Sequence, residues 1–128
     1  MCHILVVDDD RVVRQSVSTY LTRVGYQCDC LPDAAPLLEG YDTGSVDLLI
    51  LDLAMPTPGE QAIRAVRARG LDLPIVVLTG VMDQKSIVEL MELGATRVLE
   101  KPVRLAHLAS LMDLLLARGG EVPPPAPA

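Results

Sequence analysis

Five short apolar runs, separated by longer amphipathic stretches, constrain the fold of this 128-residue chain more than any other feature. Three of the runs are apolar at consecutive positions, which is typical of strands covered on both faces. In the stretches between and after the runs, apolar residues recur at helical spacing. The predicted strands are Ile4–Val7, Tyr26–Leu31, Val46–Leu51, Pro74–Thr79 and Arg97–Glu100. The predicted helices run from about Asp10 to Val24, from an N-cap at Asp33 through Tyr41, across Ile63 to Gly70, from near Asp83 to Gly94, and from about Arg104 to Ala117.

Strict alternation of strand and helix predicts a parallel sheet with right-handed crossovers and helices on both faces. A barrel of eight such units would need about twice this length. We therefore predict an α/β fold, a three-layer doubly wound (βα)5 parallel sheet over residues 1–117. Residues 118–128, "RGGEVPPPAPA", have the composition of a Gly/Pro-rich linker or tail.

Composition excludes several classes of function. The formal charge of −6 argues against a nucleic-acid-binding surface. No apolar run reaches the length of a membrane span and no signal-peptide pattern opens the chain, so we expect a cytoplasmic protein. Cys2, Cys28 and Cys30 lack metal spacing, and we interpret them as structural thiols, with Cys28 and Cys30 filling one strand face. His3 and His107 have no acidic partner at ligand spacing and are interpreted as surface or edge residues.

Carboxylates follow the first and third apolar runs directly. Asp8 and Asp9 come after the first run, and Asp52 comes after the third. Ligands of open parallel sheets bind beyond the carboxyl ends of the strands, so these three side chains would converge if the two strands are neighbours. At about 4 Å and an effective dielectric constant near 20, each like-charged pair would cost about 4 kcal/mol. A cation would offset that cost, and Mg²⁺, which takes oxygen ligands, is the natural candidate.

The remaining strand ends carry groups suited to a phosphoryl group. The fourth run ends at Thr79 and Gly80, which offer a hydroxyl and a backbone N–H, and the fifth ends at Lys101. Such donors can hold charge that is spread over phosphoryl oxygens. Asp52, which precedes a tight Met-Pro turn, is the predicted nucleophile of an acyl phosphate.

Each of these residues also has a purely structural interpretation. Asp9 or Asp10 could be the N-cap of the first helix, Asp52 a turn residue and Lys101 a surface lysine. Those interpretations do not explain why acids, a hydroxyl and a lysine should meet at one edge of the sheet. We therefore favour the phosphoacceptor interpretation.

The stretches "VVDDD", "LDLAMP", "LTG" and "GATRVLEKP" together resemble the receiver domains of two-component response regulators, over about residues 1–117. The resemblance implies a flavodoxin-like fold with strand order 2-1-3-4-5 and Mg²⁺ held by Asp8, Asp9, Asp52 and the carbonyl of Ala54. It implies that a sensor histidine kinase, a phosphotransfer protein or a small phosphodonor phosphorylates Asp52. Lys101 would pair with the phosphoryl group, Thr79 would move toward it, and the Lys101–Pro102 bond would be cis. The chain would catalyse only its own phosphorylation and dephosphorylation, so we do not expect an enzyme.

The sequence departs from the family pattern at three places. Val98 stands where receivers commonly carry a Tyr or Phe that reports phosphorylation. The turn after Asp52 is one residue shorter before its glycine, and two prolines stiffen it. Ala54 and Val81, which flank the predicted site, cannot orient an attacking water. Our hypothesis is that the acyl phosphate hydrolyses slowly unless a partner supplies a catalytic group.

Two other classes of function stay open. A pseudo-receiver would be a protein-binding module without phosphorylation. A Mg²⁺-dependent phosphatase with an Asp nucleophile would usually carry a second acid two residues further on, where Ala54 stands here. The last predicted helix is apolar over more than one face, which indicates either an attached output domain or homodimer contact, or a broad core-facing stripe.

Overall fold

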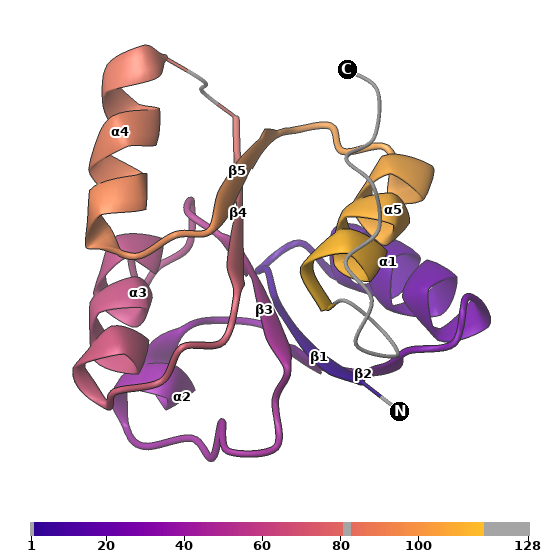
Figure 1. The fold of residues 1–128 in the computed structure, drawn as a ribbon, viewed down its shortest axis with the longest axis horizontal. Helices are drawn as coiled ribbons and strands as arrows, with labels where there is room; N and C mark the ends of the chain where they lie inside the picture. Colours follow the sequence, from indigo (N-terminus) through magenta and orange to yellow (C-terminus); the bar gives the residue numbers. More distant parts are fainter. Residues whose placement is uncertain (1, 81–82, 117–128) are drawn as a thin grey trace.

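The computed structural model describes residues 2–80 and 83–116 and contains a five-stranded parallel sheet in the order β2-β1-β3-β4-β5 (Figure 1). The strands are β1 (His3–Val7), β2 (Gln27–Leu31), β3 (Leu48–Asp52), β4 (Ile75–Thr79) and β5 (Arg97–Glu100). The helices are α1 (Arg11–Arg23), α2 (Ala35–Leu38), α3 (Gly59–Ala68), α4 (Gln84–Leu93) and α5 (Leu105–Leu116). The predicted fold class and strand order are confirmed. Val81, Ala117 and the predicted tail lie outside the described residues.

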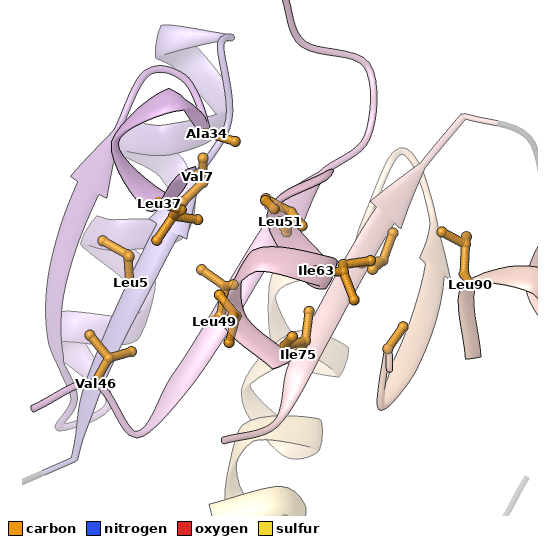
Figure 2. Close-up of a cluster of buried hydrophobic side chains, with 14 residues drawn as sticks. Leu5, Val7, Ala34, Leu37, Val46, Leu49, Leu51, Ile63, Ile75 and Leu90 are labelled. Atoms are coloured by element: carbon orange, nitrogen blue, oxygen red, sulfur yellow. The ribbon is translucent and has the colours of Figure 1, made fainter. Parts of the chain in front are cut away.

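Helices cover both faces of the sheet. Figure 1 shows α1 and α5 on one face and α2, α3 and α4 on the other. Along β1, Leu5 and Val7 point into the core under α2–α4 (Figure 2), whereas Ile4 and Val6 point into the core under α1 and α5. All residues of β3 and β4 are buried, because these central strands are covered on both faces.

Side-chain caps and a glycine set the ends of α1 and α4. Asp10 accepts hydrogen bonds from the Val12 and Val13 N–H groups and is the N-cap of α1, as one of the two structural interpretations predicted. Asp83 caps α4 in the same way. Gly94 ends α4 with a φ of 125°, a backbone conformation that favours glycine.

The second helix is shorter than predicted. It begins at Ala35 and ends at Leu38, and Tyr41 lies beyond it. Ala34 occupies the N-cap position and makes no side-chain cap. Asp33 accepts the Ala35 N–H, but it also binds Thr57 in a different loop, so its role is wider than a helix cap.

The prediction that Cys28 and Cys30 both fill one face of a strand is correct for Cys28 and wrong for Cys30. Cys28 packs partly against the core under α1 and α5, whereas Cys30 is exposed. The reason is that β2 is the edge strand of the sheet.

The apolar surface of α5 faces the core. Leu108, Leu111 and Met112 are buried, and its other leucines pack partly buried against the same core. The broad core-facing stripe therefore accounts for much of the apolar pattern of this helix, and a second contact through it stays a prediction. Among the helices of the described ranges, none is long and apolar enough to cross a membrane.

Candidate functional site

Three carboxylates meet at the carboxyl ends of β1 and β3. The two strands pair with Val7 opposite Leu51, so Asp8 and Asp52 follow side by side. One oxygen each from Asp8, Asp9 and Asp52 can be chosen so that all lie within 4.8 Å of one another. Asp8 and Asp52 are only 1% and 2% exposed, while Asp9 lies open to solvent. The predicted convergence of the three acids is confirmed.

Lys101 brings a cation between the two buried acids. Its Nζ lies 3.2 Å from Asp8 Oδ2 and 3.1 Å from Asp52 Oδ1. Its backbone N–H donates to the Thr79 carbonyl at 2.8 Å, which fixes the start of the turn, and the Lys101–Pro102 bond is cis, as the resemblance implied. Burial by itself would lower the pKa of Lys101, but hydrogen bonding and charge attraction from Asp52 and Asp8 outweigh it, so the pKa is raised. The lysine is therefore an ammonium at neutral pH.

Asp8 has a buried carboxylate oxygen that accepts no hydrogen bond from the part of the chain that the structure describes. Within the described residues its Oδ2 is buried and has no hydrogen-bond partner, although Lys101 Nζ lies within ion-pair distance. Burial raises the pKa of Asp8, and the charge of Asp52 adds to this, while the Asp10 N–H and Lys101 oppose it. One ammonium thus lies between two buried carboxylates, and a third, exposed carboxylate lies beside them. The excess of negative charge over the one ammonium and the all-oxygen donor set are consistent with a metal site for a hard cation.

The loop after Asp52 folds back on the aspartate itself. The Ala54 N–H donates to Asp52 Oδ1 at 3.3 Å. Gly59, the first residue of α3, packs so closely that a Cβ there would lie 2.9 Å from the Asp52 carbonyl oxygen. This glycine is required by close approach rather than by a positive φ. Ala54 is exposed beside the acids, and the role of its carbonyl as a metal ligand stays a prediction.

Thr79 lies at the same edge of the sheet. Leu78 pairs with Asp52 across β3 and β4, so Thr79 extends one residue beyond the aspartate, and it is largely buried. Val98 is partly buried on the face that α4 covers and packs against the core there. Val98 therefore makes a small aliphatic contact with the core, and the loss of the usual aromatic readout stays a prediction.

Neither histidine joins the site, but one has an acidic partner that the sequence did not reveal. His3 Nε2 lies 2.6 Å from Asp29 Oδ2, and its Nδ1 lies 3.2 Å from the Ser45 carbonyl. Asp29 comes from the neighbouring strand β2, so sequence spacing alone could not show the contact. The pair lies at the opposite end of β1 from Asp8. His107 is exposed on α5.

Sequence reasoning missed three residues that hold the site in place. Arg14 of α1 donates from Nη1 to the Asp8 carbonyl at 2.7 Å. Asp33 accepts from both the hydroxyl and the N–H of Thr57, in the loop that follows Asp52. The only available signal was that Thr57 lies between two prolines, so it is the one residue of the Pro56–Pro58 segment that has a backbone N–H.

Comparison with known proteins agrees with this geometry. The family model described as "Response regulator receiver domain" matches residues 4–113. Response regulator MprA of Mycobacterium ulcerans is 40% identical over 116 residues, which cover 90% of this chain and 50% of that protein. Response regulator MprA of Mycobacterium tuberculosis is 39% identical over the same length, so the chain spans about half the length of these curated relatives.

Solved structures agree as well. Chemotaxis protein CheY4 of Vibrio cholerae has a TM-score of 0.83 and 30% identity, covering 90% of this chain and 98% of that one. The receiver domain of the Francisella response regulator 1452 has a TM-score of 0.85 at 23% identity, with coverage of 92% and 98%. This second likeness concerns the fold alone.

Proposed function

Because the chain belongs to the response-regulator receiver family of two-component signalling, we propose that it is a phosphorylation switch whose phosphoacceptor is Asp52. The observation that carries this proposal is the placement of one ammonium, Lys101, between two buried carboxylates that have a third acid beside them. A nucleophile, a charge partner and an all-oxygen cation site then lie within one small space. The family is one of signalling domains, not of enzymes with a turnover substrate.

The cation site would hold Mg²⁺. Its ligands would be Asp8, Asp9 and Asp52, together with the carbonyl of Ala54. The negative charge that Lys101 leaves unbalanced and the lack of a hydrogen bond to Asp8 Oδ2 among the described residues support this assignment. When bound, the ion would neutralise charge on the phosphoryl oxygens and orient them.

The transfer itself would be a nucleophilic displacement at phosphorus. A carboxylate oxygen of Asp52 attacks the phosphorus of a phosphohistidine, and an O–P bond forms as the N–P bond breaks. The imidazole leaves with the electron pair of that bond and takes up a proton. Lys101, now 3.1 Å from Asp52 Oδ1, would then pair with the new phosphoryl oxygens. The Thr79 hydroxyl would donate to them from the end of β4.

The partners follow from this chemistry. We propose a sensor histidine kinase or phosphotransfer protein as the donor, with a small phosphodonor as substitute, in the cytoplasm. Residues 1–117 would form the receiver domain and 118–128 a linker or tail. Since the chain spans about half of its MprA relatives, an attached output domain is part of the proposal. A homodimer through the last helix is the other form of output that we consider.

The alternative is a pseudo-receiver that binds a protein partner without being phosphorylated. Val98 favours it, because a valine cannot swing a ring between buried and exposed positions as an aromatic side chain can. In the phosphorylated form, the signal would instead have to reach the surface through Thr79 and backbone shifts in the loop that follows it.

The deciding experiment is intact-protein mass spectrometry after incubation with acetyl phosphate, with and without Mg²⁺. We expect one phosphoryl adduct on the wild type that requires Mg²⁺ and disappears in Asp52→Asn. Asp72→Asn, which neutralises an exposed acid in the loop before β4, is the control and should be labelled normally. If the wild type takes no adduct at short times, while a known receiver is labelled in parallel, the pseudo-receiver is the better description.

A further inference from the structure

The loop that leaves Asp52 is fastened at its tip by a residue from another part of the chain. Thr57 donates from its hydroxyl to Asp33 Oδ2 at 2.6 Å and from its N–H to Asp33 Oδ1 at 3.0 Å. Asp33 is itself held, because its Oδ2 also accepts the Ala35 N–H at 3.0 Å. Both carboxylate oxygens of Asp33 therefore accept hydrogen bonds from Thr57, which lies 24 positions further along the chain. We call these contacts the Asp33–Thr57 tether.

The composition of the loop tip makes this contact hard to replace. Thr57 is flanked by Pro56 and Pro58, which have no N–H, so Thr57 is the donor between them. Its hydroxyl bond is the main reason that the pKa of Asp33 is lowered, so the carboxylate is charged at neutral pH. Hydrogen bonds to an ionised acceptor are stronger than neutral ones.

Two further contacts of the loop lie on Asp52. At the start, the Ala54 N–H donates to Asp52 Oδ1, and at the end Gly59 packs on the Asp52 carbonyl. The Ala54 carbonyl, which is the proposed metal ligand, therefore follows the Ala54 N–H contact along the chain and precedes the tethered Thr57. With the tip released, both the Ala54 carbonyl and the N–H that orients Asp52 would have more freedom.

We infer that Asp33 and Thr57 are positioning residues of the cation site, which hold the Ala54 segment in the arrangement that binds Mg²⁺. This inference rests on the proposed function, whose metal site it deepens. Neither residue is one of the proposed ligands of the ion. Groups that orient metal ligands from outside commonly contribute tenfold or more to affinity.

The test measures Mg²⁺ affinity by isothermal titration calorimetry, together with thermal unfolding in the absence of Mg²⁺. We expect Thr57→Val and Asp33→Ala each to raise the Mg²⁺ dissociation constant by about tenfold. Thr57→Ser, which keeps both donors, should restore the wild-type value. The double variant should bind no more weakly than Asp33→Ala, because that substitution already removes both hydrogen bonds of the tether.

A matched control separates positioning from general stability. Asp83 accepts from the N–H and the hydroxyl of Ser86 at 2.8 and 2.9 Å, the same pair of contacts made at the start of α4. Asp83→Ala should lower the unfolding temperature and leave the Mg²⁺ dissociation constant within about twofold of wild type, as expected for independent sites. Should Thr57→Val fail to fold, Asp33→Asn, which keeps the side-chain shape, supplies the comparison.

Two results would overturn the inference. One is wild-type Mg²⁺ affinity in Thr57→Val with a lowered unfolding temperature, which would make the tether purely structural. The other is a wild type that binds no Mg²⁺. If instead the wild type binds Mg²⁺ and loses affinity in the tether variants, but takes no phosphoryl group, then the proposed switch fails while the inference stands.

Discussion

Lys101 Nζ lies 3.1 Å from Asp52 Oδ1, so the proposed phosphoacceptor is ion-paired before any phosphoryl group arrives. The same ammonium lies 3.2 Å from Asp8 Oδ2. Its single positive charge is therefore shared between two buried carboxylates. The arrangement leaves negative charge uncompensated, which favours a second cation, and it also makes the lysine important for the stability of the fold.

Lys101→Ala should destabilise the protein. Removing one partner of a fully buried ion pair costs about 3–5 kcal/mol, because the remaining charge is left buried and unpaired. The lysine side chain is 27% exposed, so we expect a smaller loss of about 2 kcal/mol. Mg²⁺ should recover much of it by taking over as counter-ion. Urea unfolding with and without Mg²⁺ measures both effects, and equal stability of variant and wild type without Mg²⁺ would contradict them.

Gly59→Ala should disturb the site through packing alone. The added Cβ would lie 2.9 Å from the Asp52 carbonyl oxygen and 2.9 Å from Leu53 Cδ2, closer than real Cβ contacts. We expect a loss of about 1–3 kcal/mol in unfolding free energy, as for other overpacked sites. Gly80→Ala is the stability control, since a Cβ there meets nothing within 4 Å. A Gly59→Ala protein as stable as the control would show that α3 can move away from Asp52 at little cost.

The chain's alternation of strands and helices could be read from the sequence because buried parallel strands are apolar at consecutive positions. β3 and β4, all of whose residues are buried, were predicted for that reason. The edge strand β2 carries a mixed pattern, and nothing in it shows that Cys30 faces solvent. The order of the strands came from the resemblance to receivers, because alternation alone permits several orders.

Residues of the candidate site were predictable from the sequence where they lie at the carboxyl end of a strand. Asp8 and Lys101 directly follow β1 and β5, and Asp52 ends β3, so a parallel sheet brings them to one edge. Asp33 and Thr57 both lie in loops, and their contact depends on how two connections meet in space. The local pattern therefore favoured a helix cap at Asp33. His3 and Asp29 were missed for a similar reason, since the strand register sets their contact.

The Asp33–Thr57 tether should make the free energy of unfolding depend on pH in the acidic range. The pKa of Asp33 is lowered below its ordinary value of 3.8, first because of the Thr57 hydroxyl. A carboxyl group whose pKa is lower in the folded state contributes stability that is fully present above the unfolded pKa and lost as pH falls through the folded pKa. We therefore expect wild type to be more stable than Thr57→Val near pH 7.

That difference should shrink as the pH falls below 3.8 toward the folded pKa of Asp33. Urea unfolding of the two proteins at a series of pH values measures it, with Thr57→Ser expected to follow wild type throughout. A constant difference across this range would show that the hydroxyl bond to Asp33 does not depend on the charge of the carboxylate.

The lifetime of the phosphorylated form should depend on Ala54. This residue is exposed two positions after Asp52, and its methyl group can neither accept nor donate a hydrogen bond to an attacking water. We expect the wild-type acyl phosphate to decay slowly in the presence of Mg²⁺, because no side chain at this position orients the water. In Ala54→Gln, the amide could do so, and we expect decay to be about tenfold faster.

The measurement is intact mass against time after the phosphodonor is removed. Ala54→Leu is the matched control, because it adds a side chain of similar length that has no polar group. Faster decay in Ala54→Gln but not in Ala54→Leu would assign the effect to hydrogen bonding with water rather than to bulk. Rapid decay of the wild type itself would contradict the hypothesis, since another group would then have to orient the water in this site.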